Sequence, residues 1–364
     1  MRVIVAGAGV AGLAVARGLL NAGHDVEVYE EAPELRTAGG SVTLWPGSTA
    51  ILDEIEVDRT ELGRRLETME SWTDDGRRLF TMDLTAAERR FGRPSVHVAR
   101  RELVEALAEG VPVVYGARVE HAVPERAEVR LAGGSTVRGD VLVGADGRRS
   151  AVRAALWGDD RATLSGWVTW QGFTTAPTSL TERRRAVMIA GRRELCGLIP
   201  AGAGRLLWWF DVRAVPGGPF GGDDPDIVAR LRERFAGWAD PVPTVLETMT
   251  DVDFFPHHRH PISPVWGKGP TTLAGDSAHT MPPTMAQGAN QALEDAWLLT
   301  RSIGGDLRAY ERARARIARR PAAIAATELT NMQRAFAGLI PDRVATRLYT
   351  ASLLRFSTYL LTAS

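Results

Sequence analysis

Three glycines near the start of the chain have the spacing with which a backbone can bind a phosphate group. Gly7, Gly9 and Gly12 form a G-x-G-x-x-G sequence directly after a short apolar run. In such a turn the first glycine permits a tight bend, the second lets an anion approach the backbone, and the third lets the following helix pack closely. The amide of Ala11 would lie in the first turn of that helix, whose dipole favours an anion. The stretch is therefore predicted to bind a pyrophosphate.

An acidic residue completes this pattern. Glu30 follows the apolar stretch 25–29, at the distance from the glycines at which a carboxylate accepts hydrogen bonds from a ribose diol. Strand, glycine turn, helix, strand and acid come in the order of a dinucleotide-binding unit. The alternative is a glycine-rich turn that binds no ligand.

The composition excludes several kinds of protein. Lys+Arg and Asp+Glu each number 44 among the 364 residues, so the net charge of +0 gives no support for a nucleic-acid partner. Cys196 is the only cysteine, which excludes a disulfide within the chain and makes a structural zinc site unexpected. The histidines in 257–260 are too close together to converge on a metal, so we expect no metal site.

The first apolar run is interpreted as a strand and not as a targeting segment. It leads directly into the glycine turn, without the charged segment that begins a signal peptide. No stretch of the chain is apolar over the length of a membrane span. We therefore expect a cytoplasmic protein that does not cross a membrane.

The first part of the chain alternates short apolar strands with helical patterns. Residues 48–66 and 99–109 have the period of amphipathic helices, and 68–84 has the pattern of a hairpin with its turn at 74–76. Apolar strands alternating with helices are typical of a parallel sheet. This part is therefore predicted to be the body of a nucleotide-binding domain.

The middle of the chain has a different pattern. Residues 186–190, 194–199 and 205–212 alternate like strands of an antiparallel sheet, and 226–238 is the one clear helix among them. After this part the parallel pattern returns at 271–274, and long helices are predicted at 289–303 and 307–337.

The predicted fold class is therefore α/β. A Rossmann-type domain is interrupted by an antiparallel-sheet substrate domain, and helices follow at the C-terminal end. We expect the nucleotide-binding domain to comprise 1–67, 97–157 and 262–338, the joining hairpin 68–96, the substrate domain 158–261, and the C-terminal helical segment 339–364.

Two further motifs accompany the glycine turn. One is Gly144-Ala145-Asp146-Gly147-Arg148, and the other begins at Leu273-Ala274-Gly275-Asp276 and continues through 282–290 to Glu294-Asp295-Ala296. Together the three segments resemble the class A flavoprotein monooxygenases, the family of para-hydroxybenzoate hydroxylase. Dehydrogenases with a plain Rossmann fold do not have the second and third segments, and the resemblance covers nearly the whole chain.

The resemblance implies FAD as the cofactor and NADPH or NADH as the co-substrate. By this likeness Glu30 would hold the adenosine ribose, Arg100 the phosphate or ribityl region, and Asp276 the ribityl chain. Asp146 would lie near the pyrophosphate and the path of the nicotinamide. As alternatives, Asp146 caps a turn, Asp276 caps a helix and Arg100 is solvated. The residues expected at the cofactor are Gly7, Gly9, Ala11, Gly12, Glu30, Thr43, Arg100, Val119, Asp146, Asp276, Ala286, Gln287, Gly288, Ala289 and Asn290.

The loop before the helix at 289–303 has a physical role of its own. Gly288, Ala289 and Asn290 begin that helix, and its positive end would face the pyrimidine side of a flavin. The family pattern has Gly-Gln-Gly where this chain has Ala286-Gln287-Gly288. Ala286 therefore adds a methyl group where backbone is expected beside the ring.

Aromatic residues of the middle part are candidates for a substrate pocket. Trp208 and Phe210 share one face of their strand, while Trp209 and Asp211 share the other. Aromatic side chains on a sheet belong in most cases to its core. The alternative is that one face covers the flavin, and the residues then expected to line an apolar pocket are Trp170, Met188, Cys196 and Trp208.

The function implied is that of an NAD(P)H-dependent monooxygenase. It would insert one oxygen atom from O₂ into an apolar aromatic or alkene substrate through a flavin hydroperoxide, by hydroxylation or epoxidation. The flavin would carry the chemistry while the protein excludes water, so no catalytic residue is named. An FAD-dependent oxidase or dehydrogenase on the same scaffold is the main alternative. A flavin halogenase, for which Lys268 is the only available lysine, and a non-enzymatic FAD-binding module are the others.

Overall fold

The computed structural model describes residues 1–37, 39–158, 162–175, 184–202, 204–214, 220–222, 224–250, 252–328 and 340–363. At its centre is a five-stranded parallel sheet in the order β18-β12-β1-β2-β8. Its strands come from three separate parts of the chain: β1 (Arg2–Ala6), β2 (Asp25–Tyr29), β8 (Val113–Val114), β12 (Val141–Gly144) and β18 (Thr271–Leu273). The predicted Rossmann-type domain is thus completed by a strand from beyond residue 270.

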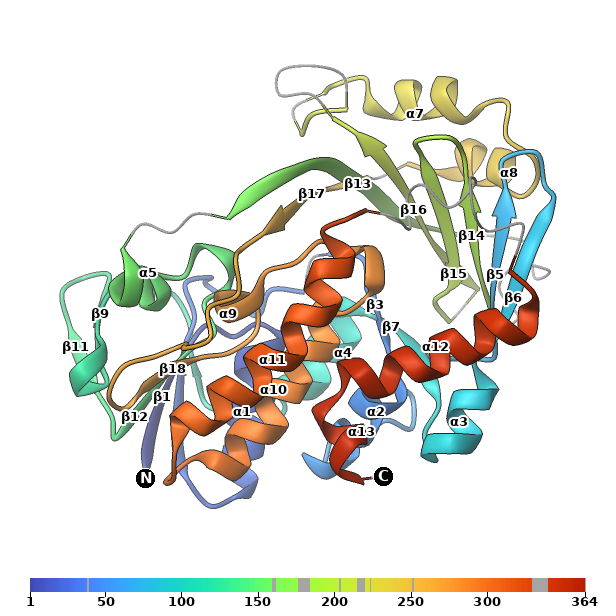
Figure 1. Ribbon diagram of the computed structural model, residues 1–364. Coiled ribbons are helices and arrows are strands. Elements are labelled where there is room, and N and C mark those ends of the chain that lie inside the picture. Colours follow the sequence, from blue (N-terminus) through green and yellow to red (C-terminus); the bar gives the residue numbers. More distant parts are fainter. Residues whose placement is uncertain are drawn as a thin grey trace.

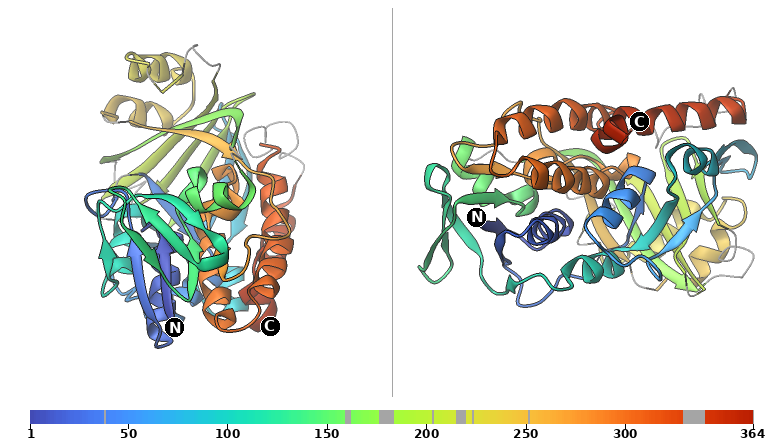
Figure 2. Two further views of the ribbon diagram at one scale, coloured as in Figure 1. Left: turned by 90° about the vertical axis from the view of Figure 1, so that its left-hand side faces the viewer. Right: turned by 90° about the horizontal axis from the view of Figure 1, so that it is seen from below.

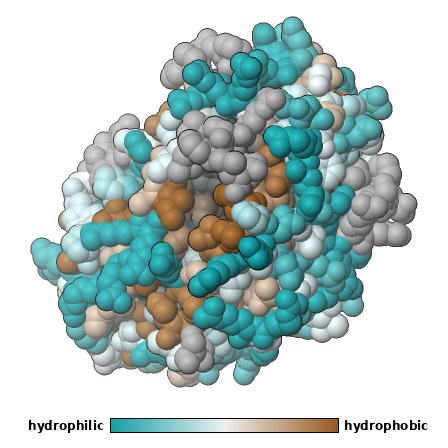
Figure 3. Space-filling view, turned by 45° about the vertical axis from the view of Figure 1, so that its right-hand side comes forward, coloured by the Kyte–Doolittle hydropathy of each residue, from teal (hydrophilic) through white to brown (hydrophobic). Residues whose placement is uncertain are grey.

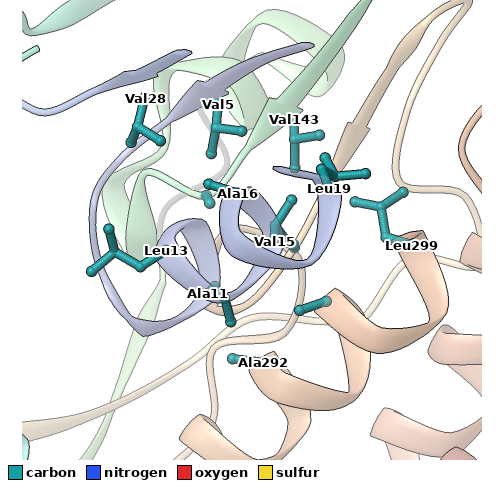
Figure 4. Close-up of a cluster of buried hydrophobic side chains, with 14 of the residues drawn as sticks. Val5, Ala11, Leu13, Val15, Ala16, Leu19, Val28, Val143, Ala292 and Leu299 are labelled. Atoms are coloured by element: carbon teal, nitrogen blue, oxygen red, sulfur yellow. The ribbon is translucent and has the colours of Figure 1, made fainter. Parts of the chain in front are cut away.

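Helix α1 (Val10–Asn21) lies between this sheet and helix α10 (Gly288–Ser302), as Figure 4 shows. Val15 and Leu19 of α1 are fully buried, and Leu299 of α10 is buried in the same cluster. The helices can approach closely because residue 18 is a glycine. A Cβ at this position would lie only 2.5 Å from the hydroxyl oxygen of Thr300. The burial of this apolar face fixes the position of the glycine turn relative to α10.

Smaller elements surround the parallel sheet. Strands β9 (Val119–Val123), β10 (Glu128–Leu131) and β11 (Thr136–Arg138) form one antiparallel sheet. A second small sheet has the order β3-β7-β4. Its strands and the nearby helices are β3 (Ser41–Leu44), β4 (Arg64–Leu66), β7 (Ser95–Ala99), α2 (Pro46–Glu54), α3 (Thr85–Phe91), α4 (Arg100–Ala108) and α5 (Ala151–Trp157).

The second large unit is a seven-stranded sheet in the order β17-β13-β16-β15-β14-β5-β6. It is antiparallel except where β14 pairs with β5, so the predicted hairpin 68–84 joins this sheet. Figure 1 shows helices α7 (Ile227–Phe235) and α8 (Val242–Thr248) over the face turned away from the parallel sheet. The strands are β5 (Thr68–Thr73), β6 (Arg78–Asp83), β13 (Thr163–Thr175), β14 (Arg185–Ala190), β15 (Leu195–Pro200), β16 (Arg205–Arg213) and β17 (Asp253–Arg259).

Two long helices connect the two units along one side of the molecule, as both views of Figure 2 show. Helix α11 (Leu307–Ala325) packs against α10, and α12 (Asp342–Phe356) packs across β6. The Asp342 carboxylate accepts hydrogen bonds from the Arg78 guanidinium (3.0 Å) and the Thr81 amide (2.9 Å). Short helices α9 (Asp276–His279) and α13 (Thr358–Ala363) complete the described helices.

Two predicted helices differ from those in the structure. The expected helix 48–66 is shorter, because α2 ends at Glu54 and Glu56 has a left-handed backbone (φ 59°). Its last three residues form β4, which pairs with β7. The predicted helix 307–337 is α11 up to Ala325, and its end beyond residue 328 lies outside the described residues. Helix α8 was not predicted, although Val242, Val245 and Leu246 are buried.

Candidate functional site

The glycine turn lies at the carboxyl end of β1. Gly7 has φ +96°, and a Cβ there would lie 2.5 Å from the carbonyl oxygen of Ala145. A Cβ at Gly12 would lie 1.9 Å from the carbonyl oxygen of Gly7, so this glycine serves close packing. No described atom lies within 4 Å of a Cβ built at Gly9. The turn therefore has open space at the glycine where an anion is expected to approach.

Glu30 is held at the end of β2, pointing toward this turn. Its side chain accepts hydrogen bonds from the amides of Ala8 (2.8 Å) and Ala32 (3.0 Å), and only 7% of its surface is exposed. The backbone oxygen of Glu30 accepts from the Ala117 amide, which brings the start of β9 and half-buried Val119 to the same corner. The carboxylate thus lies directly beside the glycine turn.

Arg100 and Asp276 lie near one another although they begin different helices. The Arg100 amide donates to Gly40 (3.0 Å), which anchors the first residue of α4 beside β3. Burial lowers the pKa of Arg100, and the nearby charges of Asp276 and Glu30 oppose that shift. Asp276 is exposed, whereas the residues on either side of it are buried. An arginine therefore lies between Glu30 and the exposed carboxylate of the third motif.

Asp146 joins the second motif to the third. One carboxylate oxygen accepts from the amides of Ala151 (2.7 Å) and Val152 (3.2 Å) at the start of α5, and the other accepts from the Ser277 hydroxyl (3.2 Å). The Ser277 oxygen accepts from the Gly147 amide (3.0 Å). Burial raises the pKa of Asp146, opposed by these hydrogen bonds. The side chain caps α5 and fixes the turn next to Asp276.

The loop before α10 is tied to β3 by the side chain of Asn290. Its amide nitrogen donates to the carbonyl oxygens of Thr43 (2.8 Å) and Ala286 (2.5 Å), and its oxygen accepts from the Trp45 amide (2.9 Å). Ala286 has a left-handed backbone with φ +48°. This conformation suits glycine, which explains in physical terms why a glycine is expected there.

The N-terminus of α10 faces open space. No described atom lies within 4 Å of a Cβ built at Gly288, and Gly288 and Ala289 are half-buried. Gln287 is buried, and its side-chain oxygen accepts from Gln291 (2.9 Å), one turn along the helix. The first turn of α10 thus presents its backbone, with the positive end of the helix dipole, beside β3.

A buried ionic network supports the third motif and was not predicted from the sequence. Asp295 accepts hydrogen bonds from the Gly275 amide (2.7 Å) and the Arg314 guanidinium (2.7 Å), and its carboxylate lies 2.6 Å from His279 Nε2. Burial raises the pKa of Asp295, but His279 and Arg314 outweigh it and the pKa is lowered. Asp295 thus fixes the turn at Gly275 that presents Asp276. Asp295 belongs to the third motif of the sequence, but nothing in the sequence pairs it with Arg314, one of several arginines of α11.

The seven-stranded sheet has an outer face under α7 and α8 and an inner face toward β3. Gly40 sits just before β3, and a Cβ built there would lie 2.7 Å from side-chain atoms of Gln171, which projects from β13. Trp209, whose ring packs over Gly197, shares this inner face with Gln171 and Asp211. The half-buried Met188 pairs with Gly197 in the sheet and also projects inward.

Three of the four residues expected to line a pocket are instead on the outer face. Trp170, Cys196 and Trp208 belong to the buried cluster that α7 and α8 cover. The expectation for these three does not agree with the structure, because strand alternation turns them toward the helices. Only Met188 lies on the inner face, where Trp209 and Gln171 were not predicted. Figure 3 shows hydrophobic side chains gathered in the middle of the molecular surface, with hydrophilic ones around them.

The glycine turn, the acid at β2 and the second and third motifs meet at one edge of the parallel sheet. Open space at Gly9 and Gly288 and an exposed carboxylate at Asp276 fit an extended dinucleotide such as FAD. This arrangement defines a flavoprotein with a second sheet over its cofactor domain. The family model described as "FAD binding domain" matches residues 1–324, and the chain belongs to this family.

Curated relatives agree with this assignment. The chain is 32% identical to the aurachin C monooxygenase/isomerase of Stigmatella aurantiaca over 317 residues, 83% of this chain and 80% of the relative. It is 33% identical to the 3-amino-4-hydroxybenzoate 2-monooxygenase PtnB3 of Streptomyces platensis, over 83% of this chain and 79% of the relative. The crystal structure of Klebsiella pneumoniae HpxO with FAD and uric acid has a TM-score of 0.83 at 26% identity, covering 98% of this chain and 93% of that one.

The protein is therefore an FAD-dependent monooxygenase of the class A type, and the resemblance found in its sequence is confirmed. The oxidase, halogenase and binding-module alternatives are not needed. Among the described residues, no helix has the length and apolar character needed to cross a bilayer.

Proposed function

We propose that this monooxygenase takes its reducing equivalents from NADH or NADPH and transfers one oxygen atom to a largely apolar aromatic or alkene substrate. The observation that carries the substrate class is the inner face of the sheet, where Trp209 and Met188 share a face with Gln171, whose side chain contacts Gly40 beside β3. The relatives are named for urate, 3-amino-4-hydroxybenzoate, aurachin C and zeaxanthin, all with rings or conjugated double bonds.

The chain's own residues would bind and orient the cofactor. When bound, FAD would supply hydride acceptance and the activation of O₂. Glu30 would hold the adenosine ribose, the turn at Gly9 the pyrophosphate, and Asp276 with Arg100 the ribityl and phosphate region. The N-terminus of α10 would stabilise negative charge on the pyrimidine side of the ring. The inner face of the second sheet would exclude water from the reacting atoms.

The direct test is anaerobic reduction of the FAD-loaded protein in a stopped-flow instrument. NADH and NADPH are compared as reductants, and the reduced protein is then mixed with O₂. We expect reduction by at least one nicotinamide, and then a transient absorbance that differs from those of both reduced and oxidised FAD. Slow reduction by both nicotinamides, or direct return to oxidised FAD without a transient, would contradict the proposal.

Replacing Glu30 by alanine should weaken FAD binding by about 10- to 100-fold. A hydrogen bond to a charged group contributes about 1.5–3 kcal/mol, and alanine removes the carboxylate that would receive the ribose hydroxyls. FAD dissociation constants measured by flavin fluorescence test this expectation. Glu31→Ala is the matched control, because Glu31 is the exposed neighbour and pairs with Arg36 (2.8 Å). Equal affinities of wild type and Glu30→Ala would make Glu30 a structural residue only.

Replacing Ala286 by glycine should change the rate of flavin reduction more than it changes FAD affinity. The methyl group lies in the loop expected beside the ring, whereas Gly9 and Glu30 are at the other end of the site. Glycine also relieves the left-handed strain at φ +48°, which is about 1–2 kcal/mol, against about 0.4–1 kcal/mol of extra unfolded-chain entropy. The net effect on the free energy of unfolding is then a gain of between about 0 and about 1.6 kcal/mol.

Stopped-flow reduction and denaturant titration of both proteins check these two expectations. Ala289→Gly is the control, because Ala289 is helical in α10 and glycine should lower stability there by about 0.5–1 kcal/mol. Identical reduction rates for wild type and Ala286→Gly would show that the methyl group does not restrict the flavin.

A further inference from the structure

The last part of the chain carries an excess of positive charge, although the chain as a whole has a net charge of +0. Residues 306–363 contain ten arginines and four acidic residues. Helices α11 and α12 of this part lie along one side of the molecule, as Figure 2 shows. The Arg320 guanidinium donates to the carbonyl oxygen of Arg355 (3.1 Å), which joins the second half of α11 to the end of α12.

Most of these arginines are exposed and have no acidic partner. Arg312 pairs with Asp306 (3.0 Å), whereas Arg319 and Arg320 donate only to backbone carbonyl oxygens. Among the residues that the structure describes, six exposed arginines of the two helices form no ion pair with an acidic side chain. We call them the basic face: Arg316, Arg319, Arg320, Arg343, Arg347 and Arg355.

The four acidic residues of this part do not neutralise the basic face. Glu311 and Glu328 are buried, at 0% and 4% exposed. Asp306 is paired with Arg312, and Asp342 is paired with Arg78 of β6 (3.0 Å). The charge that α11 and α12 present to their surroundings is therefore positive.

Exposed apolar side chains accompany these arginines. Val344 and Leu348 lie one turn apart on α12, next to Arg343 and Arg347 in the sequence, and both are exposed. At 59%, Leu348 is the most exposed large apolar side chain among the described residues. Ile324 follows Arg320 by one turn on α11 and is 42% exposed. The outer side of the two helices thus combines positive charge with apolar groups.

This combination fits a lipid surface better than the other possible occupants. Arginines on an amphipathic helix bind the phosphates of anionic lipids, while neighbouring apolar side chains enter the boundary of the acyl chains. A second copy in a symmetric contact would place arginines against arginines. A nucleic acid offers phosphates, but it has no apolar layer for Val344 and Leu348.

We propose that α11 and α12 dock the protein on the surface of a membrane that contains anionic phospholipids. The basic face would contact the lipid phosphates, and Val344 and Leu348 would enter the interfacial layer of one leaflet. This inference stands apart from the proposed oxygen transfer, because its test measures lipid binding alone.

The test is sedimentation of the FAD-loaded protein with lipid vesicles. Vesicles of phosphatidylcholine alone are compared with vesicles of three parts phosphatidylcholine to one part phosphatidylglycerol. We expect at least tenfold tighter binding to the anionic vesicles at low salt. Most of this binding should be lost at about 0.5 M NaCl, because salt screens the attraction between exposed charges.

Two variants separate the charged and apolar contributions. Replacing Arg343 and Arg347 together by glutamine should weaken binding at least tenfold, since each arginine near an anionic surface contributes about fivefold. Leu348→Gln should weaken binding at least threefold without a change in charge, because it removes apolar area from the lipid contact.

The matched control removes the same charge elsewhere. Replacing the exposed Arg126 and Arg130 by glutamine changes the small sheet of β9, β10 and β11, which Figure 1 shows at the other end of the molecule from α12. This control should bind the anionic vesicles as wild type does. Equal melting temperatures of all FAD-loaded variants verify that each is folded.

Several results would overturn the inference. They are equal binding to both kinds of vesicle, binding to neither, and wild-type binding by the variant without Arg343 and Arg347. Wild-type binding by Leu348→Gln would assign the face to an acidic macromolecule and not to a bilayer. A wild-type dimer in the absence of lipid that becomes a monomer in Leu348→Gln would assign it to a second copy of the chain.

Discussion

Replacing Arg314 by leucine is expected to lower the free energy of unfolding by about 3–5 kcal/mol, because it removes one partner of a buried ion pair. Arg314 is 0% exposed and donates to Asp295 Oδ1 (2.7 Å), to the Gln291 side chain (2.7 Å) and to the Thr358 hydroxyl (2.9 Å). Leucine leaves the buried Asp295 carboxylate without the guanidinium that it is paired with. Urea denaturation of the FAD-free protein measures the loss.

FAD affinity should fall in the same variant. Asp295 also accepts from the Gly275 amide, so its displacement moves the turn that presents Asp276. Arg312→Leu is the matched control in the same helix, because Arg312 pairs with Asp306 on the surface and should change stability by less than about 1 kcal/mol. A loss below about 1 kcal/mol in Arg314→Leu would show that the pair is dispensable.

A double variant separates the effect of the broken ion pair from the effect of altered side-chain packing. Replacing both Arg314 and Asp295 by leucine removes the uncompensated charge, so the double variant should be more stable than the sum of the single effects predicts. Additive losses would assign the effect to packing around α10 and α11 alone.

The parts of the fold that were predicted correctly are those whose signals are local. The glycine turn at Gly7, the apolar run before it and the helix after it lie within one short stretch, and the structure has all three as predicted. The hairpin 68–84 could likewise be predicted from the alternation of apolar and polar residues within it and from the turn at Gly76. Local backbone preference and alternation determine these elements with little help from the rest of the chain.

The orientation of the second sheet could not be predicted in this way. Alternation correctly separated Trp208 from Trp209, but it did not show which of the two faces α7 and which faces β3. That choice depends on α8, whose short pattern with Pro243 near its start gave little signal, and on the contact of Gln171 with Gly40. Both are tertiary features, and three of the four substrate-lining residues, Trp170, Cys196 and Trp208, were assigned to the wrong face as a result.

The buried polar clusters could not be predicted either, because they also depend on tertiary contacts. His257 and Glu328 are 71 residues apart, and Asp211 and Thr169 are 42 apart. No periodicity within one element brings such residues together. The sequence motif at 257–260 was noticed for its histidines, but the acids near His257 are Asp211 on β16 and Glu328 in the turn after α11.

Replacing Gly9 by alanine is expected to lower FAD affinity at least tenfold and to leave the FAD-free protein at least as stable as wild type. Gly9 has φ −79° and ψ −176°, which alanine adopts without strain, and no described atom lies within 4 Å of the new Cβ. The methyl group would occupy the space where the pyrophosphate is expected to approach the backbone. Gly12→Ala should act differently, because its Cβ would lie 1.9 Å from the Gly7 oxygen. That overlap would push α1 away from β1 and should lower the free energy of unfolding by about 1–3 kcal/mol even without cofactor.

Thermal unfolding of both variants, with and without excess FAD, distinguishes the two effects. A ligand that binds only the folded state raises the melting temperature, so wild type should gain stability with FAD and Gly9→Ala should gain much less. Gly12→Ala should melt below wild type in the absence of FAD. Gly237→Ala is the control for general glycine effects, since it also has open space, has no left-handed backbone, and lies just after α7, away from the glycine turn. If Gly9→Ala bound FAD as tightly as wild type, the open space at Gly9 would not be the path of the pyrophosphate, and the fingerprint in this chain would serve packing alone.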